Sequence, residues 1–83
     1  MTSKMQLTLI GKPGCHLCDD AEAVVLEVMS EFADSVTLTK QNILDDDVLF
    51  ARYSEEIPVL LIDGKVHNYW HIDPVRLRSA LSA

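Results

Sequence analysis

The chain of 83 residues has no excess of basic side chains. Thirteen acidic residues stand against seven Lys and Arg, and the formal net charge is −6 with the three His taken as neutral. Binding to nucleic-acid phosphates depends on clustered cations, and an anionic membrane surface would repel so acidic a chain. The composition therefore argues against nucleic-acid binding and against attachment to a membrane surface.

Long apolar segments are missing as well. The longest apolar stretch, residues 57–62, is interrupted by Pro58 and is far shorter than the roughly 18–20 residues that a membrane helix needs. The first four residues lead into an alternating segment, without the apolar run and small-residue cleavage site of a secretory signal. We expect a soluble cytoplasmic protein that acts as a monomer.

Cysteine is scarce, because only Cys15 and Cys18 are present. Many domains of this size rely on several disulfides or a metal, since their apolar core is limited. A bridge between residues three positions apart closes too short a loop to remove much entropy from the unfolded chain. These two cysteines are badly placed to stabilise a fold, so their presence indicates chemistry.

The overall composition is that of one ordered globular unit. Hydrophobic residues make up 48% and charged residues 24% of the chain, which argues against a disordered protein. Internal repeats, low-complexity tracts and linker-like stretches are absent from the sequence. A single domain over residues 1–83 is therefore expected.

Apolar periodicity predicts four β-strands, over residues 5–10, 36–42, 59–62 and 65–69. The Asp63-Gly64 pair between the last two strands is typical of a two-residue hairpin turn. Those two strands are therefore expected to be antiparallel. The continuous apolar run of the third strand is typical of the centre of a covered sheet.

Two longer helices are predicted by apolar residues that recur at steps of three and four. The first begins at Cys15 and is expected to end near residues 33–35. The last begins at Pro74, with Asp73 as its N-cap, and is expected to end near Leu81.

A short helix that ends near Tyr53 is expected between the second and third strands. The acidic residues 45–47 offer N-caps for it, and three apolar residues are available for burial, namely Val48, Leu49 and Ala51. The order of elements becomes β-α-β-α-β-β-α. This order predicts the α/β class, with a four-stranded mixed sheet flanked by helices on both faces and a right-handed crossover between the first two strands.

The two cysteines form a C-x-x-C sequence between the first strand and the first helix. Backbone N–H groups and the positive dipole end at a helix N-terminus favour thiolate over thiol, and a thiolate attacks disulfides. Cys18 lies one helical turn after Cys15, where it can resolve a mixed disulfide. The placement predicts that Cys15 is the more exposed and more acidic thiol, and Lys12 adds a nearby cation.

Metal binding is the main alternative. Two cysteines at this spacing can form half of a zinc or iron–sulfur site, and His67 with His71 has the H-x3-H spacing. The interval from Cys18 to His67 is far longer than in a small zinc finger. A non-enzymatic metal-binding, iron–sulfur-binding or redox-sensing module remains the alternative to a dithiol–disulfide oxidoreductase without a bound cofactor.

The combined motifs resemble those of glutaredoxin-like proteins of the thioredoxin-fold superfamily. Residues 11–18 read Gly-Lys-Pro-Gly-Cys-His-Leu-Cys, and Ile57-Pro58-Val59 opens a strand some forty residues later. The resemblance covers essentially the whole chain and implies a thioredoxin-like fold of the glutaredoxin type. It implies a thiol–disulfide oxidoreductase with Cys15 as nucleophile and Cys18 as resolving thiol. It also implies a cis peptide bond before Pro58, and pairing of the Ile57 backbone with an extended substrate chain.

The chain departs from the glutaredoxin pattern near its last helix. Where glutaredoxins carry a Gly-Gly pair against which glutathione lies, this sequence has Tyr69 and Trp70. Trp70 is expected either to cover the core or to present an exposed aromatic edge to a partner protein. Asp19 and Asp20 would also repel an anionic tripeptide at short range.

The resemblance further implies how such a pair is used and restored. The expected substrates are disulfide-containing proteins or small-molecule thiol compounds, bound with the help of Lys12, Ile57 and Pro58. An external thiol reductant would restore the dithiol, either glutathione or a reductase-linked donor. Because of Tyr69 and Trp70, we expect glutathione to serve poorly.

Overall fold

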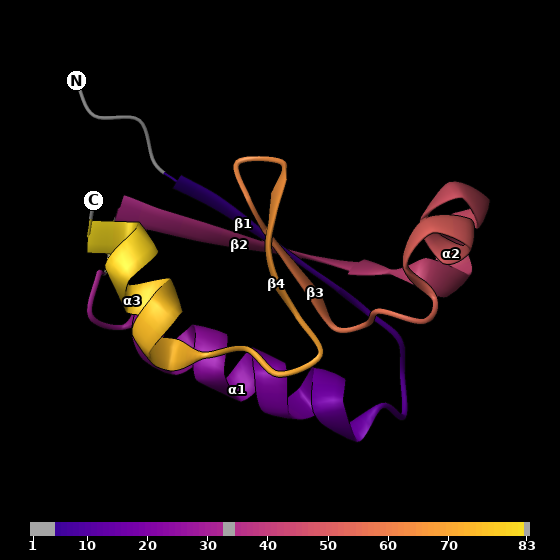
Figure 1. The fold of residues 1–83 in the computed structure, drawn as a ribbon, viewed down its shortest axis with the longest axis horizontal. Coiled ribbons are helices and arrows are strands. Elements are labelled where there is room, and N and C mark those ends of the chain that lie inside the picture. The colour runs from indigo at the N-terminus through magenta and orange to yellow at the C-terminus, as the bar shows by residue number, and fades with distance from the viewer. Residues whose placement is uncertain (1–4, 33–34, 83) are drawn as a thin grey trace.

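A four-stranded β-sheet forms the centre of the computed structural model, which describes residues 5–32 and 35–82 (Figure 1). The strands are β1 (Met5–Gly11), β2 (Val36–Asn42), β3 (Val59–Ile62) and β4 (Lys65–Tyr69). The helices are α1 (His16–Met29), α2 (Asp47–Tyr53) and α3 (Pro74–Ser82), and a 3-10 turn, η2 (Ile43–Asp45), precedes α2. The predicted order of strands and α-helices is confirmed, while η2 was not expected.

The sheet has the order β2-β1-β3-β4. β1 pairs in parallel with β2 and antiparallel with β3, and β3 pairs antiparallel with β4. Asp63 and Gly64 have φ values of 50° and 85°, the positive angles that a two-residue hairpin turn requires. The mixed sheet and the hairpin are therefore confirmed, and the apolar strand β3 occupies one of the two central positions.

Helices α1 and α3 lie together on one face of the sheet (Figure 1). The buried cluster between them and the sheet joins Leu7 of β1 and Leu60 of β3 to Val25 of α1 and Leu77 of α3. At the outer surface the Arg78 guanidinium forms a salt bridge with the Glu31 carboxylate at 2.8 Å. This layer is the larger part of the core, and it fixes the direction of α1 relative to β1.

A second buried cluster lies beside the first, and helix α2 contributes to it. Ile10 of β1 and Val59 of β3 meet Tyr53 of α2 and Ile57 of the following segment. Figure 1 shows α2 at one end of the sheet, beyond the end of β2. The cluster also contains Cys18, with Cys15 packed against it, so the cysteines lie at the end of β1 that this cluster covers.

Helix α1 is shorter than the apolar spacing predicts. It ends at Met29, and the amide of Ser30 donates to the carbonyls of Leu26 and Val28. The Ser30 hydroxyl donates to the Glu27 carbonyl at 2.6 Å, a local bond that competes with continuation of a helix. Ala33 and Asp34, where the end was expected, lie outside the described residues. None of the helices in the described ranges has the length and apolar character needed to cross a bilayer.

The burial predicted for α2 is largely wrong. Asp46 is the N-cap, as the acidic run predicts, and its carboxylate accepts from the amides of Val48 and Leu49. Val48 is 68% exposed and Ala51 is exposed, however, while Leu49 is only partly buried. The helix has only seven residues, so few of its side chains can face the sheet. Leu49 and Tyr53 are four residues apart and lie on the same face of the helix, and Tyr53 is the residue that this face buries.

Candidate functional site

Cys15 is the N-cap of α1, the place at which the sequence predicts an activated thiol. Its backbone is extended, with φ −100° and ψ 112°, and its carbonyl accepts from the Asp19 amide at 3.1 Å. The Cys15 sulfur accepts a hydrogen bond from the Cys18 amide at 3.3 Å. A helix-end amide that points at the sulfur stabilises negative charge there.

The two sulfur atoms face each other. Both cysteines are free thiols, and the Cys18 thiol donates to the Cys15 sulfur at a separation of 2.6 Å. A disulfide bond is about 2.05 Å long, so little movement separates the dithiol from a bridge. The Cys15 sulfur thus receives two donors, one from the Cys18 backbone and one from the Cys18 side chain.

Burial distinguishes the two thiols. Cys15 is partly exposed, whereas Cys18 is only 8% exposed, which confirms the predicted difference in exposure. Burial raises the pKa of Cys18 to about 11, and its hydrogen bond to Cys15 acts in the same direction. A backbone hydrogen bond from Lys12 opposes the rise in this pKa. Cys18 is consequently protonated near neutral pH and can act as the donor to Cys15.

Gly11, the last residue of β1, is a site residue that sequence reasoning placed only in a turn. A Cβ atom added to it would lie 2.9 Å from the Cys18 sulfur and 3.2 Å from the Cys18 Cβ. The absence of a side chain therefore lets Cys18 pack against the strand end. The only signal in the sequence is the position of a glycine four residues before the first cysteine, and this signal does not reveal the contact.

The Ile57–Pro58 peptide bond is cis, as the family resemblance implies. Ile57 is buried in the same cluster as Cys18, and Cys15 packs against that cluster, so the structure brings this segment and the cysteines together. The Ile57 amide donates to the Tyr53 carbonyl at 3.1 Å. A substrate chain would have to replace that bond or use the Ile57 carbonyl, and the substrate-binding role of Ile57 and Pro58 stays a prediction.

Trp70 is attached to the segment that contains Pro58. Its backbone amide donates to the Pro58 carbonyl at 2.9 Å, and its indole N–H donates to the Glu55 carbonyl at 3.0 Å. The residue is 50% exposed and has a φ of 62°, a conformation that glycine adopts most easily. Of the two expected placements, the structure shows the exposed aromatic ring, since Trp70 is half-exposed and belongs to neither buried cluster. Its hydrogen bonds also join it to the neighbouring loop.

Asp73 caps helix α3, as predicted. Its carboxylate accepts from the amides of Val75 at 2.8 Å and Arg76 at 3.3 Å. These two bonds satisfy backbone donors at the start of the helix.

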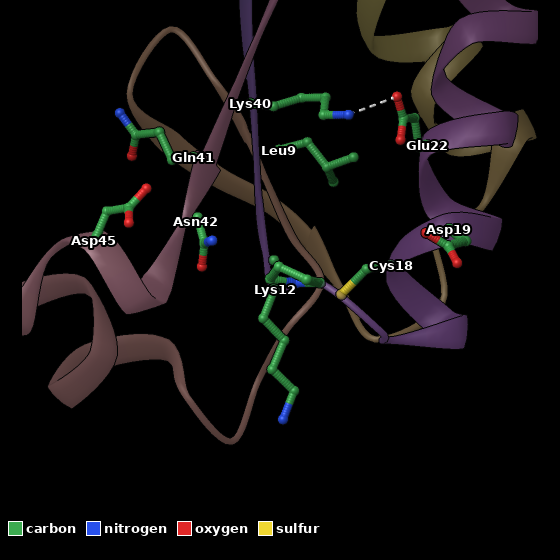
Figure 2. Close-up of a pocket in the computed structure, with 11 residues that line it drawn as sticks. Leu9, Lys12, Cys18, Asp19, Glu22, Lys40, Gln41, Asn42 and Asp45 are labelled. Carbon is green, nitrogen blue, oxygen red and sulfur yellow. Dashed lines mark hydrogen bonds and ion pairs between the residues drawn. The ribbon is translucent and has the colours of Figure 1, made fainter.

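A pocket of about 380 Å³, which Cys18 helps to line, lies between α1 and the end of β2 (Figure 2). Lys40 and Glu22 form a salt bridge of 2.9 Å within it. Figure 2 shows the Lys12 side chain extending away from Cys18, on the side opposite this salt bridge. Lys12 thus contacts Cys18 through its backbone, and its role in substrate binding stays a prediction.

The described residues do not assemble a metal centre. Residues 5–32 and 35–82 contain no group of three or more His, Cys, Asp or Glu side chains placed to hold a metal ion. His67 is partly buried and its Nε2 atom has no hydrogen-bond partner within those ranges. Burial, followed by the nearby Arg76, lowers the pKa of His67, whereas His71 is exposed in a groove beside Trp70.

Known proteins with the same pattern identify the family. A family model described as glutaredoxin-like domain (DUF836) matches residues 6–82. The chain belongs to this glutaredoxin-like family. Uncharacterized proteins of Mycobacterium bovis and Mycobacterium tuberculosis are each 32% identical to it over 89 residues, which is 96% of this chain and 86% of theirs.

Solved structures agree with the fold of this glutaredoxin-like domain. An X-ray structure of a protein from X. campestris has 32% identity and a TM-score of 0.74, covering 92% of this chain and 95% of that one. A solution NMR structure of a protein from Nitrosomonas europaea has 24% identity and a TM-score of 0.77, covering 96% and 94%. The resemblance read from the sequence is thereby confirmed at the level of family and fold.

Alkylation should distinguish the two thiols of the glutaredoxin-like domain. In the reduced protein between about pH 7 and 9, iodoacetamide should label Cys15 first, because Cys18 is buried and its pKa is raised to about 11. In Cys15→Ser, labelling of Cys18 should stay slow at pH 7 and accelerate as the pH rises, because burial, the largest cause of its raised pKa, remains. Peptide mapping by mass spectrometry would measure both rates, and faster labelling of Cys18 in the wild type would contradict the order.

Replacement of Gly11 by alanine should disturb the site through Cys18 alone. The new Cβ would meet the Cys18 sulfur at 2.9 Å, and overpacking of this kind reduces the free energy of unfolding by about 1–3 kcal/mol. The same substitution in a Cys18→Ala background should cost less, because the sulfur is gone. Urea unfolding of the four proteins in this cycle gives the coupling, and equal losses in both backgrounds would show that Gly11 acts elsewhere.

Proposed function

We propose that this glutaredoxin-like domain is a thiol–disulfide oxidoreductase that works through Cys15 and Cys18. One observation carries the proposal: a partly exposed sulfur at the N-cap of a helix accepts hydrogen bonds from the amide and the thiol of a buried second cysteine. Family membership supports a thiol-redox fold. The activity itself is inferred from the arrangement of the two thiols.

The first step is attack of the Cys15 thiolate on one sulfur of a substrate disulfide. A bond forms between the Cys15 sulfur and that sulfur, the substrate S–S bond breaks, and the second substrate sulfur leaves as a thiolate that takes up a proton. The amide of Cys18 and the positive end of α1 stabilise the attacking charge. The product is a mixed disulfide between Cys15 and the substrate.

The second step is attack of Cys18 on the Cys15 sulfur of the mixed disulfide. The hydrogen bond to Cys15 and the charge of Cys15 both raise the pKa of Cys18 in the dithiol, and both are lost once Cys15 is bonded to the substrate. Cys18 then releases its proton more readily, although its burial continues to oppose this. The Cys15–Cys18 bond forms, the S–S bond between Cys15 and the substrate breaks, and the remaining substrate sulfur leaves as a thiolate that takes up a proton. Over both steps the substrate gains two electrons and two protons.

The expected substrates are disulfide-containing proteins or small disulfides that present an accessible S–S bond to Cys15. Ile57 lies in the cluster that contains Cys18, and the next residue, Pro58, is fully buried, which supports a role of this segment in holding an extended substrate chain. The exposed Lys12 precedes Cys15 by three residues and would favour anionic parts of a substrate or of a leaving thiolate. The domain would act as a monomer without a bound cofactor.

An external thiol must return the bridge to the dithiol. Glutathione or a reductase-linked donor could supply the two electrons, in a reducing compartment such as the cytoplasm. Trp70 and Tyr69 occupy the place where the glutaredoxin pattern has small residues, and Trp70 is held there by two hydrogen bonds. A reductase-linked donor therefore fits this site better than glutathione does.

Serine variants would separate the two thiol roles. Cys18→Ser should accumulate a mixed disulfide between Cys15 and a substrate such as oxidised insulin-type disulfide peptides, because the resolving thiol is missing. Cys15→Ser should form none and should lose disulfide reduction. Intact mass under non-reducing conditions measures the adduct, with the wild type as the control that does not accumulate it. A stable adduct on Cys18 in the Cys15→Ser protein would reverse the assignment.

Glutathione should reduce the oxidised domain slowly, with poor saturation. Trp70→Gly should accelerate this reaction, because glycine suits the φ of 62° and removes the ring. Trp70→Phe is the matched control, since it loses the indole N–H but keeps an aromatic ring and should stay slow. A coupled assay with glutathione reductase gives the Michaelis constants. A low constant for the wild type, unchanged in Trp70→Gly, would show that the ring does not block glutathione.

A further inference from the structure

A groove of about 120 Å³ runs between α1 and the segment that joins β4 to α3. Its walls are mainly apolar and include Leu17, Val24, Trp70 and Ile72. Two polar side chains, those of Asp20 and His71, line it as well. Leu17 separates the two cysteines in the sequence and is 38% exposed. Trp70 donates to the carbonyl of Pro58. The groove therefore lies against the start of α1, which carries the redox pair, and beside the segment bonded to Pro58. We call it the α1–Trp70 groove.

Acidic residues lie in the two segments that adjoin this groove. Asp20 lines it and follows the exposed Asp19, which lines the pocket at Cys18, and Glu55 and Glu56 are exposed directly before Ile57. The Trp70 indole binds the Glu55 carbonyl at 3.0 Å, which fixes this segment beside the groove. The two salt bridges found among the described residues use Glu22 and Glu31, and none of these four carboxylates takes part in them. We call them the acidic rim.

Nearby cations balance the acidic rim only in part. Lys12 is exposed at the turn before Cys15, and Arg52 of α2 is exposed with its guanidinium 5.6 Å from the centre of the Tyr53 ring. The chain as a whole carries a formal charge of −6. A positively charged segment is therefore attracted both by the whole domain and by the rim, whereas an anionic segment is repelled.

We propose that the α1–Trp70 groove and the acidic rim dock a positively charged polypeptide segment that carries its disulfide next to an apolar side chain. The apolar side chain would enter the groove, and the cationic side chains would lie against the four carboxylates. Charge complementarity raises the rate of encounter, and burial of the apolar side chain supplies affinity. This inference rests on the proposed function, since the docked disulfide accepts two electrons and two protons from Cys15 and Cys18 as their bridge forms.

Three synthetic disulfide peptides would test the charge requirement. They share one sequence with a leucine beside the half-cystine and differ only in flanks of lysine, glutamine or glutamate. Stopped-flow measurement of oxidation of the reduced domain at low salt should rank the rates lysine, glutamine, glutamate. The first and last should differ by about tenfold, as a few exposed charge pairs permit. The difference should shrink at about 1 M salt, where the screening length falls to about 3 Å, and alanine in place of the leucine should slow the lysine peptide.

Matched variants would locate the effect. Asp20→Asn and Glu55→Gln each remove one charge of the rim and should each reduce the lysine-to-glutamate ratio about two- to threefold. Glu27→Gln removes the same charge from α1, but two helical turns, about 10 Å, beyond Asp20, and should leave the ratio nearly unchanged. All three positions are exposed, so the fold should tolerate the substitutions.

The outcomes separate the docking surface from the chemistry. Equal rates for the three peptides, or an equal loss of preference in Glu27→Gln and Asp20→Asn, would overturn the docking surface and leave the oxidoreductase proposal standing. Failure of every peptide, and of the small neutral hydroxyethyl disulfide, to oxidise the pair would overturn the proposed function itself. A preference of the wild type for the lysine peptide that falls in Asp20→Asn and Glu55→Gln but not in Glu27→Gln supports the inference.

Discussion

Contact between the Cys18 sulfur and the backbone of Gly11 is the constraint on which the site depends. β1 is a central strand and ends at Gly11, and a side chain there would collide with the sulfur. Close approach of helix and strand buries the Cys18 thiol and directs its proton at Cys15. The same approach leaves Cys15 at the surface, where the helix begins. One missing Cβ atom thus supports both the burial of one thiol and the exposure of the other.

Two thiols three residues apart acquire different properties from this arrangement. Desolvation acts on Cys18 and raises its pKa to about 11, whereas donors from the helix start act on Cys15. These effects are linked, because the proton that Cys18 retains is the one it shares with the Cys15 sulfur. Bond formation at Cys15 removes that link and lowers the barrier to ionisation of Cys18. The arrangement of the resting dithiol thus favours the order of the two steps in the proposed reaction.

Local signals made much of this fold predictable. The Asp63-Gly64 turn, the apolar strand β3 and the carboxylate caps at Asp46 and Asp73 depend on a few neighbouring residues, and all are found. Burial of Tyr53 in place of Val48 depends on how a short helix is rotated against the sheet, which periodicity over seven residues cannot determine. The contact of Gly11 with Cys18 depends on how α1 packs against β1, and the contacts of Trp70 reach back to Glu55 and Pro58, so no local pattern reveals them.

Selection of substrates must come from the surface around the cysteines, because a thiolate attacks any accessible disulfide. In a glutaredoxin, small residues beside the last strand admit the backbone of glutathione. Here Trp70, with a φ of 62°, places a bulky ring there, and the indole N–H bond to the Glu55 carbonyl holds the ring. The ring that we expect to obstruct a small anionic tripeptide also forms one wall of a mainly apolar groove that Asp20 lines as well. Substitution of this one position therefore changes both what the site excludes and what it can hold.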